Sequence, residues 1–179
     1  TWILAGILFG AATSSVPHTH AAQALLLQDS YVRQTSAGNP LNYGFSAPLM
    51  IDGRVSFNTK TLLQFELNPA LPQNSRAERV LKATLLLYII QVGTPGALQV
   101  GAASKDWNEA SVTGFNAPNS LSDPITLVPY ATAPVSLANR WIAIDVTELV
   151  RDWVDGSMPN KGLVLSAADS KLVMSIGSK

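Results

Sequence analysis

Short runs in which apolar and polar side chains alternate recur along most of this sequence. In the run TLLQFEL, Leu63, Phe65 and Leu67 share one face, and the polar residues between them point the other way. A period of two residues is the signature of a β-strand with one buried face. The chain is therefore predicted to consist mainly of strands that pack their apolar faces together.

Turn signals rich in Gly, Pro and Asn separate these runs, which is typical of an all-β sandwich or jelly roll. The run 83–92 is apolar on both faces and is predicted to be a central strand. One helix is predicted over 147–155, because its apolar residues recur at helical spacing and Gly156 follows its end. The other predicted strands are 61–67, 97–103, 125–128, 140–146, 162–167 and 172–176.

Residues 2–12 (WILAGILFGAA) form an apolar run of signal-peptide length that is too short to cross a bilayer as a helix. Small residues at positions 22 and 24 suit a cleavage site after Ala24. We predict a signal peptide over 1–24, whose basic n-region is missing, and secretion of residues 25–179 without a membrane span. The alternative is that the apolar run is a buried strand or helix of the fold itself.

The residue types that most often catalyse reactions are absent after position 24. The sequence has no Cys, and its histidines are His18 and His20. The exported chain would lack the usual general base at neutral pH and the strongest zinc ligands. Its 12 basic and 12 acidic residues cancel and form no basic stripe, which argues against nucleic-acid binding. We predict a non-enzymatic protein without a cofactor.

Seven blocks of sequence follow one another after residue 24. They are DSYV at 29–32, NYG at 42–44, LLQFELNPAL at 62–71, ATLLLY at 83–88, DWNEASVTGFNAP at 106–118, WIAIDVTELVRDW at 141–153 and NKGLVLS at 160–166. In this order they resemble the DNRLRE domain family of secreted proteins, which overlaps the family-96 carbohydrate-binding modules. The sequence departs from the family at Gly114-Phe115, where the family has an aromatic residue directly after the Thr. The motif that gives the family its name is reduced to Ser178-Lys179, so the final strand is expected to be cut off.

The resemblance implies an antiparallel, jelly-roll-like β-sandwich with one short helix near 147–155. It also implies a non-catalytic module that binds polysaccharide or extracellular matrix at the cell surface, joined to other domains of a larger surface protein. Some members of the family bind acidic polysaccharides. Two other functions stay open: a structural or adhesin unit of a cell-surface protein or fibre, and, with less support, a jelly-roll polysaccharide-degrading enzyme.

Five residues are candidates for ligand binding. Trp107 stands beside Asn108 in a polar loop, where its ring could stack on a sugar or hold the loop against the sheet. Tyr43 has the same two possible roles. Arg54 and Lys60 could bind carboxylate or sulfate groups if they share a face with other basic residues of the first half, although solvated surface charge is the ordinary role of such residues. These other residues are Arg33, Arg76, Arg79 and Lys82.

Two further groups have structural interpretations. A structural calcium ion could bind near Asp29 and Asp106, since Ca²⁺ takes several oxygen ligands, but no dense acidic run is present. Trp153 is predicted to fill the core from the helix. Trp141 is predicted to pack in the core or at its rim, with a sugar platform as the alternative.

Overall fold

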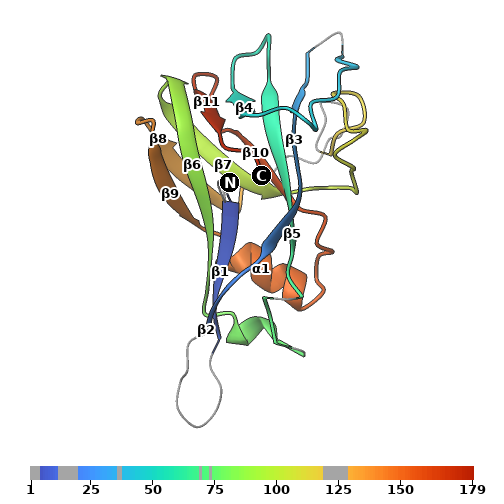
Figure 1. Cartoon of the computed structure of the whole chain (residues 1–179), viewed down its shortest axis with the longest axis vertical. Coiled ribbons are helices and arrows are strands. Elements are labelled where there is room, and N and C mark those ends of the chain that lie inside the picture. The colour runs from blue at the N-terminus through green and yellow to red at the C-terminus, as the bar shows by residue number, and fades with distance from the viewer. Residues whose placement is uncertain (1–4, 12–19, 36–37, 69, 73, 119–128) are drawn as a thin grey trace.

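The computed structural model describes residues 5–11, 20–35, 38–68, 70–72, 74–118 and 129–179, and most of them lie in or between strands (Figure 1). The predicted strand at 125–128 lies outside these residues. The strands are β1 (Ala5–Ala11), β2 (His20–Gln23), β3 (Leu25–Arg33), β4 (Leu49–Asp52), β5 (Thr59–Glu66), β6 (Lys82–Thr94), β7 (Gly96–Ala102), β8 (Ala131–Val135), β9 (Arg140–Asp145), β10 (Leu163–Ala167) and β11 (Val173–Ile176). The helical elements are the 3₁₀-helix η1 (Ala77–Arg79) and the α-helix α1 (Thr147–Val154).

Every strand pairing in the described residues is antiparallel. The strands follow the order β6-β11-β4-β5-β10-β7-β8, with β9 on the other edge of β6 and β3 on the other edge of β5. The sheet curls until β8 comes near β9, so it is nearly closed like a barrel. The predicted antiparallel, jelly-roll-like fold with one short helix is confirmed.

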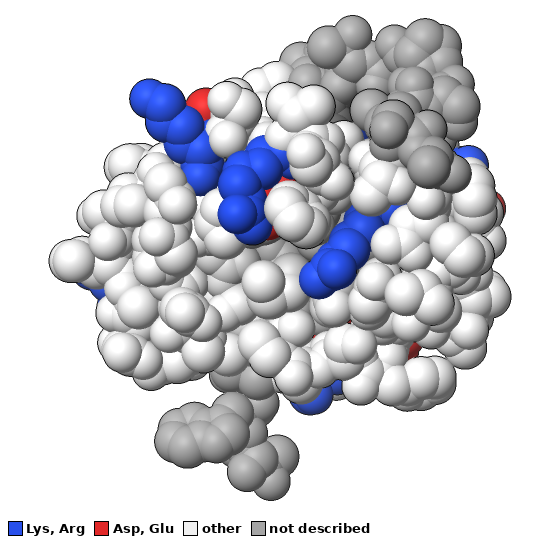
Figure 2. Space-filling view, turned by 90° about the horizontal axis from the view of Figure 1, so that it is seen from above, with Lys and Arg blue, Asp and Glu red and all other residues white. Residues whose placement is uncertain are grey.

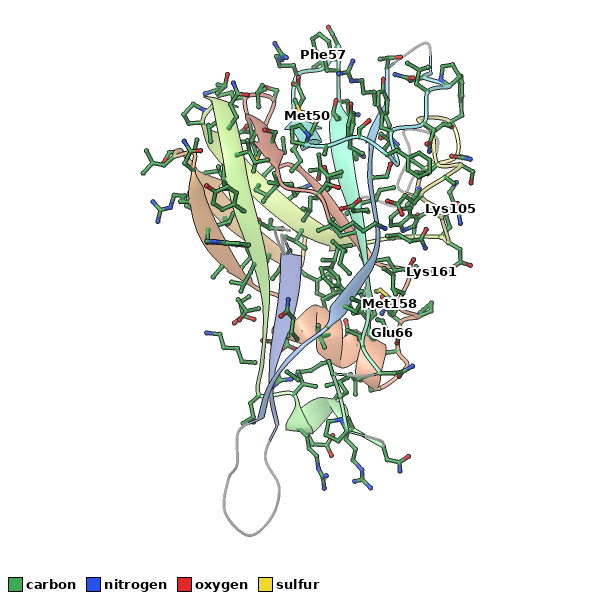
Figure 3. All side chains as sticks on the ribbon, in the orientation of Figure 1. Met50, Phe57, Glu66, Lys105, Met158 and Lys161 are labelled. Carbon is green, nitrogen blue, oxygen red and sulfur yellow. The ribbon has the colours of Figure 1, made fainter. Side chains whose placement is uncertain are left out.

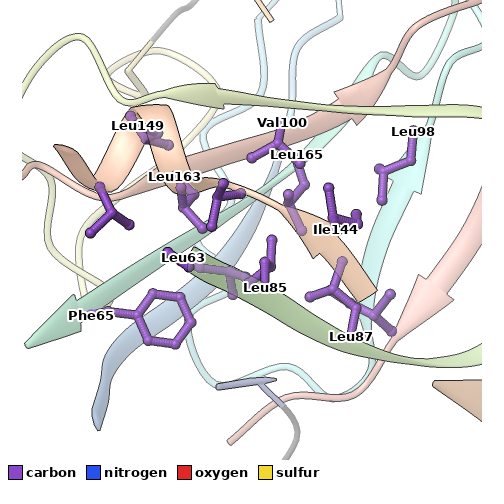
Figure 4. Close-up of a cluster of buried hydrophobic side chains, with 14 of the residues drawn as sticks. Leu63, Phe65, Leu85, Leu87, Leu98, Val100, Ile144, Leu149, Leu163 and Leu165 are labelled. Atoms are coloured by element: carbon purple, nitrogen blue, oxygen red, sulfur yellow. The ribbon is translucent and has the colours of Figure 1, made fainter. Parts of the chain in front are cut away.

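The inward side chains of these strands form one large apolar core (Figure 4). The alternation in β5 places Leu63 and Phe65 in this core, as predicted, and both are almost completely buried. Leu85 and Leu87 of β6 face them from across the barrel. Burial of these large side chains is the main source of stability in a fold of this kind.

The helix α1 closes one end of the barrel, called the lower end here because it lies low in Figure 1. Leu149, Val150 and Trp153 are buried against the strands, which confirms the predicted apolar face. Thr147 begins the helix and is not its cap residue. Its backbone N–H and hydroxyl both donate to the carboxylate of Asp145, at 2.9 and 2.6 Å.

A smaller apolar cluster lies on the outer face of the β3–β5 pair. Val32 and Leu62 are fully buried there under Val112 and Ala117, which belong to the long connection after β7. Trp107 packs against the same cluster. The outer face of these strands is therefore covered by loops, and the loops are held by their own apolar contacts.

The apolar run near the start of the chain lies partly in β1, which pairs with β6 on one side and β2 on the other. This arrangement corresponds to the alternative that the run is a strand of the fold. Cleavage after Ala24 remains a prediction. Among the described residues, no helix is both long enough and apolar enough to cross a membrane.

Candidate functional site

The turn between β4 and β5, at the upper end of the barrel, holds a bidentate ion pair. Arg54 Nε and Nη2 donate to the Asp52 carboxylate at 3.0 and 2.6 Å, and the Arg54 backbone N–H adds a bond of 3.0 Å. The Asp52 side chain is only 8% exposed, whereas that of Arg54 is 54% exposed. The carboxylate is therefore fixed inside the fold, and the guanidinium keeps an open side toward solvent.

Arg33, at the end of β3, adds a second guanidinium to this end. It lies over the ring of Tyr43, 5.5 Å from the ring centroid, and its charge acts on Asp52. Its Nε is buried and has no hydrogen-bond partner among the described residues. This end of the barrel therefore carries a second positive charge beside an aromatic ring.

The charge state of Asp52 follows from these neighbours. Burial disfavours its charged form, but the hydrogen bonds from Arg54 and the charges of Arg54 and Arg33 outweigh burial, so the pKa of Asp52 is lowered. The carboxylate is thus ionised at neutral pH. One negative charge faces two positive ones, and the group as a whole carries a net positive charge.

Tyr43 is held in place from both sides of its loop. Its ring stacks on Tyr31 with centroids 4.3 Å apart. The Asn42 side-chain amide donates to the backbone oxygens of Glu109 and Val112, at 2.8 and 2.7 Å. Position 44 requires glycine, because a Cβ atom there would lie 1.9 Å from the Glu109 carbonyl oxygen. The NYG block therefore fixes a rigid aromatic side chain beside Arg33.

Exposed apolar side chains surround these groups on the loops of the upper end. Phe57 is 40% exposed, lies 4.6 Å from the Arg54 guanidinium, and is labelled at the top of Figure 3. Phe45 is 87% exposed and Phe115 is 60% exposed. Viewed from above, Lys and Arg side chains stand around a shallow hollow (Figure 2). We call Arg33, Tyr43, Asp52, Arg54 and Phe57 the upper-end cluster.

Trp107 and Asn108 line a separate groove of about 430 Å³. The indole N–H of Trp107 donates to the Lys161 backbone oxygen at 3.0 Å. The ring packs on the smaller apolar cluster on the outer face of the β3–β5 pair, called the outer cluster from here on. The ring thus holds the loop against the sheet, which is the packing role considered for it above. Asn108 contributes an oxygen that accepts the backbone N–H of Ala110 at 2.9 Å.

Lys60 does not join the upper-end cluster. It pairs with Val32 while Arg33 pairs with Thr59, so Lys60 and Arg33 lie on opposite faces of the β3–β5 pair. Burial lowers the pKa of the Lys60 ammonium group. Of the five ligand-binding candidates, only Tyr43 and Arg54 belong to the upper-end cluster, whereas Trp107 and Asn108 share the separate groove.

The two acidic residues considered for calcium lie in different surroundings. Asp29 is 1% exposed and accepts the Ser178 hydroxyl at 3.0 Å and the Lys179 backbone N–H at 2.7 Å. Asp106 is exposed at the rim of the Trp107 groove. Within the described part of the chain, no three His, Cys, Asp or Glu side chains gather as a metal site would require.

A cavity of about 760 Å³ lies at the lower end, but its polar lining is engaged in the fold. The Asn160 amide donates to the Phe65 backbone oxygen at 3.0 Å, and its side-chain oxygen accepts the Gly162 N–H. Gln64 accepts a bond from Gln28 at 2.8 Å. These groups support the strand ends and leave little to recognise a ligand.

Trp141 is 49% exposed on β9, so of the two packing positions predicted for it, the core and its rim, the core is wrong. It packs edge-on against Tyr88 of β6, with centroids 5.4 Å apart. The two rings form a small aromatic patch on these two strands. No charged group of the upper-end cluster lies on these two strands.

Sequence reasoning missed Asp52 and Phe57 as ligand-binding residues, and it named Arg33 only as one of several basic residues. Alternation along β3 places Arg33 on the same face as Tyr31, so its position could have been found from the DSYV block. The Asp52-Gly53-Arg54 spacing fits a turn in which a carboxylate accepts the N–H two residues later. Phe57 gave no signal, because only the folded turn brings its ring under Arg54.

The sequence profile of carbohydrate-binding module family 96 matches residues 21–179. The matched region contains the whole upper-end cluster and the Trp107 groove, and it leaves out β1. A search of curated proteins found no significant match.

Proposed function

Because the chain belongs to carbohydrate-binding module family 96, which implies non-catalytic polysaccharide binding, we propose that it binds an acidic polysaccharide at the upper-end cluster. One observation carries this proposal. The guanidinium of Arg54 is held by the buried carboxylate of Asp52 and stays 54% exposed beside Phe57, and Arg33 adds a second positive charge beside Tyr43. Such a group suits the carboxylates or sulfates of a polymer.

The side chains of the upper-end cluster and the nearby Phe45 can each contribute to the recognition of an acidic polysaccharide. A guanidinium is planar, stays charged at neutral pH, and can bind a carboxylate or sulfate through two parallel hydrogen bonds. The Asp52 carboxylate fixes the Arg54 side chain in advance, which reduces the entropy lost on binding. Phe57 and Phe45 offer exposed apolar faces on which sugar rings can stack.

The cellular setting is part of the same proposal. Carbohydrate-binding module families are usually extracellular, and the apolar run at 2–12 with small residues at 22 and 24 supports secretion by a signal peptide. We expect the module to act outside the cell or at its surface, beside other domains of a larger protein. Binding would then hold those domains near the polymer.

Affinity electrophoresis and calorimetry against a panel of neutral, carboxylated and sulfated polysaccharides test the proposal. The chain should bind acidic members and ignore neutral ones. Arg33→Gln and Arg54→Gln should each weaken binding by about tenfold or more, since each removes a charge-assisted hydrogen-bond donor. Added salt should weaken wild-type binding as well.

Arg76→Gln is the matched control, because Arg76 is an exposed arginine beside η1 at the lower end. This variant should bind like the wild type. Equal affinity of all three variants for an acidic polymer would disprove the upper-end site. Preference for neutral polymers would disprove the proposed ligand class.

A further inference from the structure

Three of the sequence blocks that carry the family resemblance meet the pair Ser178-Lys179 beside the loop of Tyr43. The blocks contribute Asp29, Asn42 and Glu109. Hydrogen bonds join these residues, called the Glu109 network here, across 67 positions of the chain between Asn42 and Glu109 and 149 between Asp29 and Ser178. None of them belongs to the upper-end cluster, so any effect of the network on that cluster has to pass through Tyr43.

The network starts at the buried carboxylate of Asp29 in β3. This carboxylate is 1% exposed, and it accepts the Ser178 hydroxyl at 3.0 Å and the Lys179 backbone N–H at 2.7 Å. A buried carboxylate needs such donors, because it has lost the hydrogen bonds of water. The two bonds hold the backbone of Lys179 against β3, and from there its ammonium group reaches Glu109.

Glu109 is tied to β3 through its side chain and through its backbone. Lys179 Nζ donates to Glu109 Oε2 at 2.6 Å and to the Leu27 backbone oxygen at 2.7 Å. The side chains of this ion pair are 38% and 17% exposed, so solvent screens it less than a pair on the open surface. The Glu109 backbone N–H donates to Gln28 Oε1 at 2.8 Å. These contacts fix the position of the Glu109 carbonyl group.

The Glu109 carbonyl group in turn holds the loop that carries Tyr43. It accepts the Asn42 side-chain amide at 2.8 Å, and the Gly44 backbone packs against it too closely for a Cβ atom. Asn42 and Gly44 flank Tyr43 on both sides, and the guanidinium of Arg33 lies over the Tyr43 ring. A shift of Glu109 would therefore shift the ring on which Arg33 rests.

We propose that Lys179, Glu109 and Asn42 are positioning residues for the glycan site, which set the ring of Tyr43 and through it the guanidinium of Arg33. This inference rests on the proposed function, and it gives a share in affinity to three residues that do not touch the ligand. A cation over the face of an aromatic ring is attracted to that face, so the ring determines where the charge lies. A charge that is fixed in advance costs less entropy when the polymer binds.

Lys179→Met tests the proposal, because it removes the ammonium group and keeps an unbranched apolar side chain. Calorimetry uses the carboxylated polymer polygalacturonate and the sulfated polymer dextran sulfate. For each polymer that the wild type binds, Lys179→Met should lower the affinity about threefold or more. Lys179→Arg can still pair with Glu109 and should bind like the wild type. Lys82→Met is the matched control, since it removes an equal charge from an exposed lysine at the start of β6 and should also bind like the wild type.

A double-mutant cycle separates positioning from a general structural effect. If Lys179 acts through Tyr43, Lys179→Met should cost no further affinity in a Tyr43→Ala background. It should keep its full effect in an Arg54→Gln background, because Arg54 is held by Asp52 and not by the Glu109 network. Equal losses in both backgrounds would overturn the proposal, and so would equal affinity of Lys179→Met and Lys82→Met.

The chemical shifts of the Tyr43 ring protons separate this inference from the proposed function, because they are recorded without ligand. The ring stacks on Tyr31, and Lys179→Met should move its shifts toward those of a free tyrosine. If the wild type binds no acidic polymer, the proposed function is wrong, and the ring shifts alone decide the positioning role. Shifts that are the same in Lys179→Met and the wild type would show that Lys179 does not position Tyr43.

Discussion

The two ends of the barrel are closed by different kinds of side chain, although the same strands connect them. At the lower end, α1 inserts Trp153 and its apolar neighbours into the core. At the upper end, Arg33, Asp52 and Arg54 meet beside aromatic rings, and much of Arg54 and Phe57 stays in solvent. The lower closure is mainly apolar, whereas the upper closure is charged and open.

This difference separates stability from recognition. Apolar closure depends little on pH or salt, and it gains free energy from every side chain that it buries. A charged closure gains less free energy of folding, because exposed ion pairs contribute little to stability. It does leave charged hydrogen-bond donors in solvent, where a ligand can reach them. Changes at the lower end should therefore alter melting, and changes at the upper end should alter binding.

The largest effect is expected for Trp153→Ala. Removing a buried aromatic side chain leaves a cavity and should lower the free energy of unfolding by about 3–5 kcal/mol. Denaturant unfolding measures this loss, while affinity for an acidic polysaccharide should persist below the melting transition. Trp153→Phe is the control: it should cost far less, because the indole N–H has no partner among the described residues. Near-native stability of the alanine variant would mean that α1 does not close the core.

Trp107→Ala should have an intermediate effect. The half-buried ring packs on the outer cluster and donates to the Lys161 backbone oxygen, so its loss should cost about 1–3 kcal/mol. Thermal unfolding and polysaccharide titration measure stability and affinity on the same sample. A variant with unchanged stability but strongly reduced affinity would move the binding surface from the upper-end cluster to the Trp107 groove.

Asp52→Asn should lower stability by about 1–2 kcal/mol at pH 7, because it weakens hydrogen bonds to a charged partner. The sign of its pH dependence follows from the lowered pKa of Asp52. The stabilising contribution is present above the unfolded pKa of about 3.9 and is lost as pH falls through the lower folded value. Unfolding curves of wild type and variant should therefore converge in acid. A constant difference down to pH 2 would contradict the ion-pair role.

The sequence predicts the helix and the strands with a clear apolar pattern well. It predicts the short strands and the residues of the upper-end cluster less well. β5 and α1 follow their apolar periods closely, and β6 contains the run 83–92 that is apolar on both faces. β4 and β8 are only four and five residues long, and β8 contains Pro134, so no period could establish them. The upper-end cluster joins β3, the Tyr43 loop and the Asp52 turn, and such proximity depends on strand register that local patterns do not specify.

The smallest effect is expected for Trp141→Ala. The ring is half exposed and makes an edge-on contact with Tyr88, and an aromatic pair of this kind contributes about 0.5–1.5 kcal/mol when well packed. Exposure should bring the loss below about 1 kcal/mol, and affinity for acidic polysaccharides should stay unchanged. Titrating Trp141→Ala and Arg33→Gln with the same acidic polysaccharide compares the two possible binding surfaces directly. If Trp141→Ala abolishes binding while the arginine variant binds normally, the ligand lies at Trp141 and Tyr88 on β9 and β6, and the open upper end has another role.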